Sequence, residues 1–416
     1  MPEPDDIEAE IMGTVPAPAP QSTDYYSFGC TLLDLLVGGG TGMGIPGGYM
    51  LNLVGDSSSG KTLVAMELLA TNYHRWKKAG FKWNNDDAES GNTFDTQGTY
   101  GVELTPETAR KSNTIQEMDA NVGLWLQELK KKDRGVYIVD SLDSLSDVEA
   151  EKAAAAREKL MEEGKEVVDK GSYAMGTAAF LSKSFFKVRI GQLADHNAIL
   201  IIISQVRENL DAGLYGKKLK ISGGKALKFY AHTQMWLSTV CKIEKAGLPI
   251  GVVVEAKCEK SKTPRPFRSC RFSILFGYGV DEIGSNLDYL FDLRGKDGKL
   301  VKAAESIAWS GKEKNLKNLT RFLADRNAVP LAREGKKKDT GVPMLSVDWL
   351  LGWIPGQDAL GPEFLKEFGT GTQDREALVQ MIDQDPTMQA ELKQRVVVKW
   401  EAGESAARIE RKGKYA

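Results

Sequence analysis

The residues with the clearest chemical signature form one short segment: Gly55, Asp56, Ser57, Ser58, Ser59, Gly60, Lys61 and Thr62. An apolar run at 49–54 precedes the segment, and the pattern at 63–73 predicts an amphipathic helix beginning at Leu63. The residue types and spacing match the P-loop, which binds phosphates between a strand and a helix. Its glycines let the backbone wrap tightly, so that N–H groups and the helix N-terminus face an anion. We expect residues 55–63 to bind a nucleotide, whereas the alternative is a serine-rich turn before an ordinary helix.

Three side chains in and near this segment could handle phosphate and metal. Lys61 is expected to contact the β- and γ-phosphates, and the Thr62 hydroxyl is expected to ligate Mg²⁺. A second apolar run, at 135–139, ends in Asp140. This is the form of a Walker B strand, whose carboxylate holds the water shell of the metal. The predicted cofactors are therefore ATP and Mg²⁺, and the alternative for Asp140 is a residue in a surface turn.

Composition limits the class of protein. The chain has 416 residues, 42% of them hydrophobic, which favours two domains over one. A net charge of -2 gives no overall basic field, so a polyanion would have to bind a local patch. Four cysteines without CxxC spacing and three isolated histidines give no readable zinc site. The acidic, proline-rich N-terminus and the absence of long apolar runs favour a cytoplasmic protein with no membrane partner.

The fold follows from alternating strand and helix patterns. We predict strands at 49–54, 81–88, 135–141 and 198–204, separated by helical patterns at 63–73, at 148–170 and up to 193. This order is typical of a doubly wound, mainly parallel α/β sheet, in which ligands bind at the carboxyl ends of the strands. Glu89, Asp140 and Gln205 stand at those ends and should converge on the nucleotide. The strand at 81–88 is unusually polar.

The segment at 206–222 is predicted to be a long basic loop. It combines an aromatic and an aliphatic residue with several cations: Arg207, Leu214, Tyr215, Lys217, Lys218 and Lys220. Long loops inside compact domains are usually functional, and basic residues around an aromatic suit a nucleic-acid backbone with stacked bases. The alternative is a solvated loop.

A family resemblance emerges at the next segment. Residues 223–231, which read GGKALKFYA and begin eighteen residues after Gln205, resemble the segment that closes the second DNA-binding loop of the bacterial RecA recombinases. The P-loop and the short blocks at 87–89, 138–141, 203–207, 266–267 and 272–277 are similar to RecA in order and spacing. The resemblance covers about residues 25–290 and returns weakly near the C-terminus.

The resemblance implies roles at the nucleotide. Glu89 would be the general base that activates water, and Gln205 would sense the γ-phosphate and pass its presence to the DNA loop. Lys260 and Lys262 would reach the ATP of a neighbouring subunit. Without the resemblance, these two lysines would be interpreted as part of a solvated hairpin.

The resemblance also implies DNA contacts. Met175 and Gly176 would form the tip of the first DNA loop, and Tyr215 with Gly216 would insert between base triplets. The remaining implied DNA-binding residues are phosphate contacts or parts of the second loop and its closing segment: Lys187, Arg207, Lys217, Lys218, Gly223, Gly224, Lys225 and Lys228. Single-stranded DNA is the expected primary partner, together with self-association into filaments.

Several positions depart from the family pattern. Phe180 and Glu255 stand where the family has basic residues, so duplex DNA is expected only as a secondary partner. The polar strand at 81–88 leaves open a shift of the general base to Asp87. The C-terminal end is basic where the family tail is acidic, which suggests either a weak duplex-DNA gateway or a solvated terminus.

We expect three regions: a short arm at 1–24, which is a disordered tail or an oligomerisation hook, a RecA-like core at 25–290, and a smaller α+β C-terminal domain at 291–416. The last region is enlarged by an insertion and ends in the basic tail. Asp385 is predicted to cap a helix that starts at Pro386. The expected function is a DNA-dependent ATPase that forms filaments on single-stranded DNA and promotes homologous pairing and strand exchange. The alternative is a RecA-fold motor or regulatory ATPase without strand exchange.

Overall fold

The computed structural model describes residues 24–39, 43–91, 94–130, 133–162, 180–208, 219–221, 224–263, 265–290, 292–300, 379–380 and 382–407. Several predicted features lie outside these ranges: the arm at 1–23, the first-loop tip at Met175 and Gly176, and the second-loop residues Tyr215, Gly216, Lys217, Lys218 and Gly223. Residues 301–378, which contain the predicted insertion, and the basic tail at 408–416 also lie outside them.

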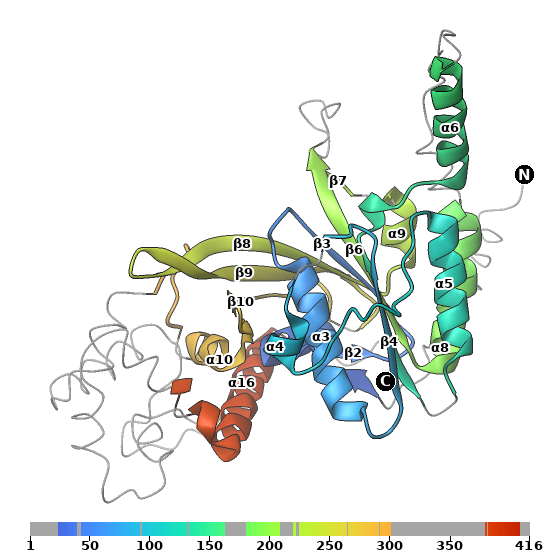
Figure 1. The fold of residues 1–416 in the computed structure, drawn as a ribbon. Helices are drawn as coiled ribbons and strands as arrows, with labels where there is room; N and C mark the ends of the chain where they lie inside the picture. The colour runs from blue at the N-terminus through green and yellow to red at the C-terminus, as the bar shows by residue number, and fades with distance from the viewer. Residues whose placement is uncertain are drawn as a thin grey trace, which may run out of the picture.

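A nine-stranded mixed sheet forms the centre of the molecule (Figure 1). Its order is β11-β10-β9-β8-β3-β6-β5-β4, with β7 paired to β6. The strands β4, β5, β6, β3 and β8 are mutually parallel, whereas β9, β10 and β11 continue the sheet in antiparallel fashion. The bounds are β3 Met50–Gly55, β4 Phe81–Asp87, β5 Arg134–Asp140, β6 Ile199–Glu208, β7 Leu219–Ile221, β8 Thr233–Lys245, β9 Leu248–Ser261, β10 Ser269–Leu275 and β11 Gly279–Asp281.

Helices cover both faces of the sheet, as the predicted doubly wound fold requires. One face packs on α2 (Thr31–Gly38), α3 (Lys61–Trp76), α10 (Glu282–Leu290) and α16 (Pro386–Ala406). The other packs on α5 (Ile115–Gln127), α8 (Phe186–His196) and α9 (Gly224–Tyr230). Alternate residues of the central strands enter the two buried clusters, which explains why these strands are apolar along their whole length.

The shorter elements complete the connections. The strands β1 (Tyr25–Tyr26) and β2 (Ile45–Pro46) pair with each other, and α4 (Thr96–Tyr100) precedes α5. After β5 come the short turn η1 (Leu142–Ser144) and α6 (Val148–Glu162), and the π-helical turn η2 (Leu181–Phe185) leads into α8. None of the helices in the described ranges has the length and apolar character needed to cross a membrane.

The prediction of a loop throughout 206–222 is wrong at both ends. The strand β6 continues to Glu208, and β7 returns against it with Val206 opposite Ile221 and Glu208 opposite Leu219. We name this two-stranded element, residues 206–208 with 219–221, the β6–β7 ribbon. Its two halves are separated in sequence by ten residues, so their pairing has no local signal in either half.

The described end of the chain packs directly on the core. Ile382, Met388, Leu392, Val396 and Trp400 join the same buried cluster as α2 and α10. Arg268 forms an ion pair with Glu404 of α16, 2.5 Å between Nε and Oε1. The predicted helix start at Pro386 is confirmed, and the Asp385 carboxylate accepts a hydrogen bond from the Met388 N–H at 3.3 Å.

Candidate nucleotide site and nucleic-acid surface

The glycine-rich segment connects the end of β3 to the start of α3. Gly60 has φ 87°, in the left-handed region that side chains disfavour, so glycine is required there. At Gly55 a Cβ would lie 2.5 Å from the Leu237 carbonyl oxygen and 2.5 Å from Ser59 Oγ. The backbone is therefore wrapped as tightly as a phosphate-binding loop requires, and the loop is followed by the N-terminus of a 16-residue helix.

The lysine and the hydroxyl of this loop face the carboxylate at the end of β5. Thr62 Oγ1 donates to Asp140 Oδ2 at 2.7 Å, and Lys61 Nζ donates to the Asp56 carbonyl oxygen at 2.7 Å. Burial raises the pKa of Asp140 to about 6, although the Thr62 hydrogen bond opposes the shift. Burial also lowers the pKa of Lys61, against the field of Asp140 and Glu89. A bound divalent cation would stabilise the charged form of Asp140.

The donor set fits Mg²⁺ held jointly by protein and nucleotide. Thr62 and Asp140 supply adjacent oxygen atoms, the ligand type that Mg²⁺ prefers. Among the residues that the structure describes, no group of three or more histidine, cysteine or carboxylate side chains could hold a metal alone. Magnesium usually binds through one or two protein ligands together with water and substrate phosphates, and this arrangement suits that mode.

Glu89 and Gln205 meet at the carboxyl edge of the sheet. Gln205 Nε2 donates to Glu89 Oε1 at 2.9 Å, and Ser141 Oγ donates to the same oxygen at 2.6 Å. The Glu89 backbone N–H donates to the Asp140 carbonyl at 3.2 Å. The structure thus brings together the ends of β3, β4, β5 and β6, where the sequence predicts the site.

The polar strand β4 is explained by the segment that packs beside it. Asn84 exchanges hydrogen bonds with the backbone of Arg110, at 3.0 and 2.7 Å. Asp86 is fully buried and accepts from the Ser112 N–H at 2.8 Å, from Ser112 Oγ at 2.5 Å and from Tyr137 OH at 3.0 Å. Asp86 therefore anchors the chain at 110–112, and Glu89 is the carboxylate that contacts Gln205.

Sequence reasoning missed one residue of this edge. Asp143, in η1, accepts a hydrogen bond from the backbone N–H of Gln205 through Oδ2 at 2.7 Å. It also belongs to the group of carboxylates whose charge raises the pKa of Lys61. The only available signal was its position three residues after Asp140, outside the recognised motif.

Lys260 and Lys262 lie at the opposite edge of the sheet from the P-loop. Lys260 of β9 lies opposite Gln234, at the start of β8. Gly55 of the P-loop lies opposite Leu237, three residues further along β8. Lys260 Nζ donates to the carbonyl oxygens of Lys228 and Phe229, at 2.7 and 2.5 Å, at the C-terminal end of α9. Burial, together with Lys262 and Lys228, lowers the pKa of Lys260 to about 8. The structure does not bring either lysine to the P-loop of its own chain.

The described part of the proposed DNA surface contains exposed cations and one exposed ring. Lys187 on α8 and Lys228 on α9 are exposed, and Phe229 is 73% exposed. Arg207 belongs to β6, and Gly224 and Lys225 begin α9. In Figure 1 the β6–β7 ribbon and α6 both project from the upper side of the molecule.

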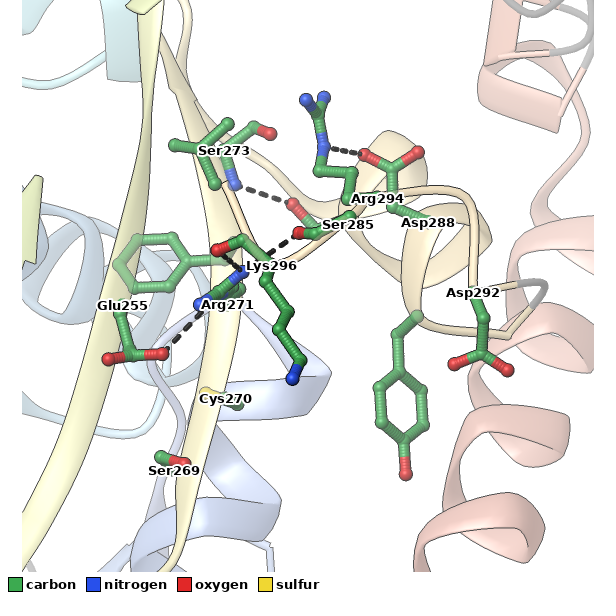
Figure 2. Close-up of a pocket in the computed structure, with 14 residues that line it drawn as sticks. Glu255, Ser269, Cys270, Arg271, Ser273, Ser285, Asp288, Asp292, Arg294 and Lys296 are labelled. Carbon is green, nitrogen blue, oxygen red and sulfur yellow. Dashed lines mark hydrogen bonds and ion pairs between the residues drawn. The ribbon is translucent and has the colours of Figure 1, made fainter. Parts of the chain in front are cut away.

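A pocket of about 390 Å³ lies away from the nucleotide edge, between β9, β10 and α10 (Figure 2). Arg271 donates to Glu255 at 3.0 Å and to the carbonyls of Gly295 and Lys296, and Arg294 pairs with Asp288 at 2.6 Å. The predicted departure at Glu255 therefore comes with a compensating arginine on the neighbouring strand. Both arginines are therefore paired within the chain.

Sequence comparisons with known proteins agree with the resemblance to RecA. A family model described as the RecA N-terminal domain matches residues 148–281. Protein RecA of Campylobacter fetus subsp. fetus is 27% identical over 311 residues, covering 74% of this chain and 81% of that protein. The Helicobacter hepaticus protein is 27% identical over 334 residues (78% and 88%), and that of Sulfurimonas denitrificans 29% over 311 residues (73% and 80%). A solved structure, the RadB recombinase, aligns with TM-score 0.40 and 17% identity, covering 61% of this chain and 98% of that one.

Proposed function

Because the chain is similar to RecA proteins over about three quarters of its length, we propose that it is a DNA-dependent ATPase that forms helical filaments on single-stranded DNA and promotes homologous pairing and strand exchange. One observation supports this most directly. The carboxylate at the nucleotide edge, Glu89, is hydrogen bonded to Gln205, the residue from which the β6–β7 ribbon starts. The nucleotide site and the proposed DNA element therefore share a residue contact.

The proposed chemistry divides the work among the residues of the carboxyl edge. Lys61 and the backbone of residues 55–62 would bind the phosphates, and Thr62 and Asp140 would hold Mg²⁺, which would supply positive charge to offset that of the phosphates. Glu89 accepts a proton from the attacking water, and Ser141 holds the carboxylate in place. Gln205 responds to the γ-phosphate.

Self-association is proposed because two lysines assigned to the nucleotide by resemblance lie away from the P-loop of their own chain. Lys260 and Lys262 lie at the edge of the sheet that faces away from the P-loop of the same chain. In a head-to-tail assembly, opposite edges of successive subunits meet, and an assembly that does not close becomes a helical filament. Two lysines at a neighbour's γ-phosphate would stabilise charge that develops during transfer.

The proposed DNA surface consists of Lys187, Arg207 and Lys228 with residues 209–218 and 223–225. Cations beside an aromatic ring suit a single strand, whose phosphates and bases are both accessible. Duplex DNA is proposed as a secondary partner, with the basic tail at 408–416 as its gateway. The region boundaries at 24/25 and 290/291 are part of the same proposal.

The experiment compares ATP hydrolysis with and without single-stranded DNA and images the same samples by electron microscopy. We expect DNA-stimulated hydrolysis and open helical filaments when an ATP analogue and single-stranded DNA are both present. Lys61→Ala is the inactive control, and Lys78→Ala, at an exposed lysine after α3, is the matched active one. Closed rings with DNA-independent turnover would favour the motor or regulatory ATPase instead.

A further inference from the structure

Asp143 occupies a junction in the sheet. The registered pairing of β5 with β6 ends at Val139 and Ile202, whereas β3 pairs with β6 as far as Gln205. Gln205 lies beyond the last paired residues of β5, so its amide has no β5 residue opposite it. Backbone N–H groups in such positions need another acceptor. The Asp143 carboxylate supplies it to Gln205, at 2.7 Å.

The same residue marks the start of the ribbon. Directly after Gln205, β6 changes neighbour, and Val206 pairs with Ile221 of β7. Gln205 is consequently held at two points, its amide by Asp143 and its side chain by Glu89. Ser141 Oγ also donates to Glu89, so the segment after β5 fixes both carboxylate partners of Gln205.

We propose that Asp143 is the positioning residue that couples the nucleotide site to the β6–β7 ribbon, a regulatory role that rests on the proposed function. Because Asp143 holds the Gln205 amide, the β6 backbone does not slide along its axis when the Gln205 side chain moves relative to Glu89. The ribbon instead changes its orientation about the Gln205 amide. Coupling between two sites needs such a connected element with a defined pivot.

Two properties of Asp143 have to be separated by the test, its hydrogen-bond acceptor and its charge. The charge contributes to the field at Lys61. Asp143→Asn removes the charge and keeps an acceptor oxygen of the same reach, whereas Asp143→Ala removes both. An effect confined to the alanine variant would show that the hydrogen bond to the Gln205 amide matters. An effect of equal size in both variants would show that the charge of Asp143 matters.

The first measurement is the ratio of ATPase rates with and without single-stranded DNA. We expect Asp143→Ala to lower this ratio by about fivefold or more, the lower range of measured couplings, while Asp143→Asn keeps most of it. The KM for ATP should agree between the two variants within about threefold, because neither change removes a phosphate contact. A wild-type ratio in Asp143→Ala, or an equal loss in both variants, would overturn the proposal.

The second measurement needs no DNA and separates this inference from the proposed function. Amide hydrogen exchange is followed in peptides covering 199–208 and 219–221, with and without a non-hydrolysable ATP analogue. We expect the analogue to change exchange in the ribbon of the wild type and of Asp143→Asn, but not of Asp143→Ala. If the wild type shows no DNA-stimulated ATPase, the proposed function fails. The exchange measurement still tests whether the Asp143–Gln205 hydrogen bond couples nucleotide binding to the ribbon. An analogue response that persists in Asp143→Ala would refute it.

Thermal unfolding checks that both variants fold. Should Asp143→Ala fail to fold, Asp143→Ser replaces it under the same criteria, because the serine hydroxyl is neutral and lies one bond closer to the main chain than the carboxylate oxygen.

Discussion

The two edges of the parallel sheet differ in how their candidate residues are satisfied. At the carboxyl edge, Thr62 bonds to Asp140 and Gln205 to Glu89, all within one chain. At the opposite edge, Lys260 donates to main-chain carbonyls at the end of α9, and its pKa is lowered to about 8. The first edge is an assembled candidate site, whereas at the second edge a cation is bonded to carbonyl oxygens that carry no full charge.

In the proposed filament, this difference means that the two edges contribute to different steps of catalysis. An assembled site can bind a nucleotide alone, because its donors are already oriented. Cations held near one another at the far edge repel each other and gain from an anion supplied by another subunit.

The largest expected effect is at the P-loop. Lys61→Ala should lower ATP hydrolysis by about 10³-fold or more and weaken ATP binding, because the phosphates lose the mobile cation of the loop. Steady-state ATPase assays and nucleotide titration measure this. Unchanged turnover in Lys61→Ala, with Lys78→Ala as the matched control, would remove the P-loop from the mechanism.

The next effect concerns Glu89. Glu89→Gln keeps the shape of the side chain and removes the base, so hydrolysis should fall by about 10²- to 10⁴-fold while DNA-bound filaments form and persist. Single-turnover ATPase and filament lifetime on DNA are the measurements. If Asp87→Asn produces this phenotype and Glu89→Gln does not, the base belongs to Asp87.

Mixing two inactive variants tests both edges together. A Lys61→Ala subunit keeps its far-edge lysines, and a Lys260→Ala/Lys262→Ala subunit keeps its P-loop. Each alone should be nearly inactive, but co-assembled filaments should recover part of the wild-type rate, because one kind of mixed interface joins two intact halves. Mixed filaments that form and show no recovery at any ratio would mean that the lysines do not act across the interface.

The carboxyl edge could be predicted from sequence because its signals are local. The P-loop and the strand ending at Asp140 each carry their pattern within a few residues, and the structure confirms the strands. The polar strand β4 could not be interpreted in the same way, because Asn84 and Asp86 are satisfied by residues 110–112, far along the chain. The β6–β7 ribbon and the contact of Lys260 with α9 depend on tertiary pairing for the same reason.

Asp143 shows a further limit of sequence reasoning. It was missed because a single aspartate outside a motif has many possible surroundings. Only the register of β5 and β6 shows that the Gln205 amide lies beyond the paired residues and donates to the Asp143 carboxylate instead. Residues that act through a neighbour's backbone leave no pattern in the sequence.

A smaller effect is expected from pH at the far edge. The pKa of Lys260 is lowered to about 8, so this side chain is charged below that pH and loses its proton as the pH rises through it. The DNA-stimulated ATPase rate should therefore fall on the alkaline side, with a midpoint above that value, because the neighbour's phosphate favours the charged form of Lys260. Lys260→Arg keeps its charge, so its profile should stay flat to higher pH, whatever its absolute rate. An alkaline limb of the same midpoint in Lys260→Arg would assign the limb to another group.

The smallest expected effect is at the DNA surface. Lys228 is exposed on α9, although its backbone carbonyl accepts from Lys260, so its side chain is available to a phosphate. Replacing one phosphate contact should reduce the slope of log K against log salt by about 0.7 for a single strand. Lys228→Ala should therefore flatten the salt dependence of single-strand binding slightly and weaken affinity at low salt, with Lys82→Ala, an exposed lysine on β4, as the matched control. Fluorescence anisotropy across a salt series measures both quantities. Because the change leaves the carboxyl edge intact, ATP binding without DNA should equal that of the control. A slope identical in the two variants would show that the Lys228 side chain does not contact the DNA.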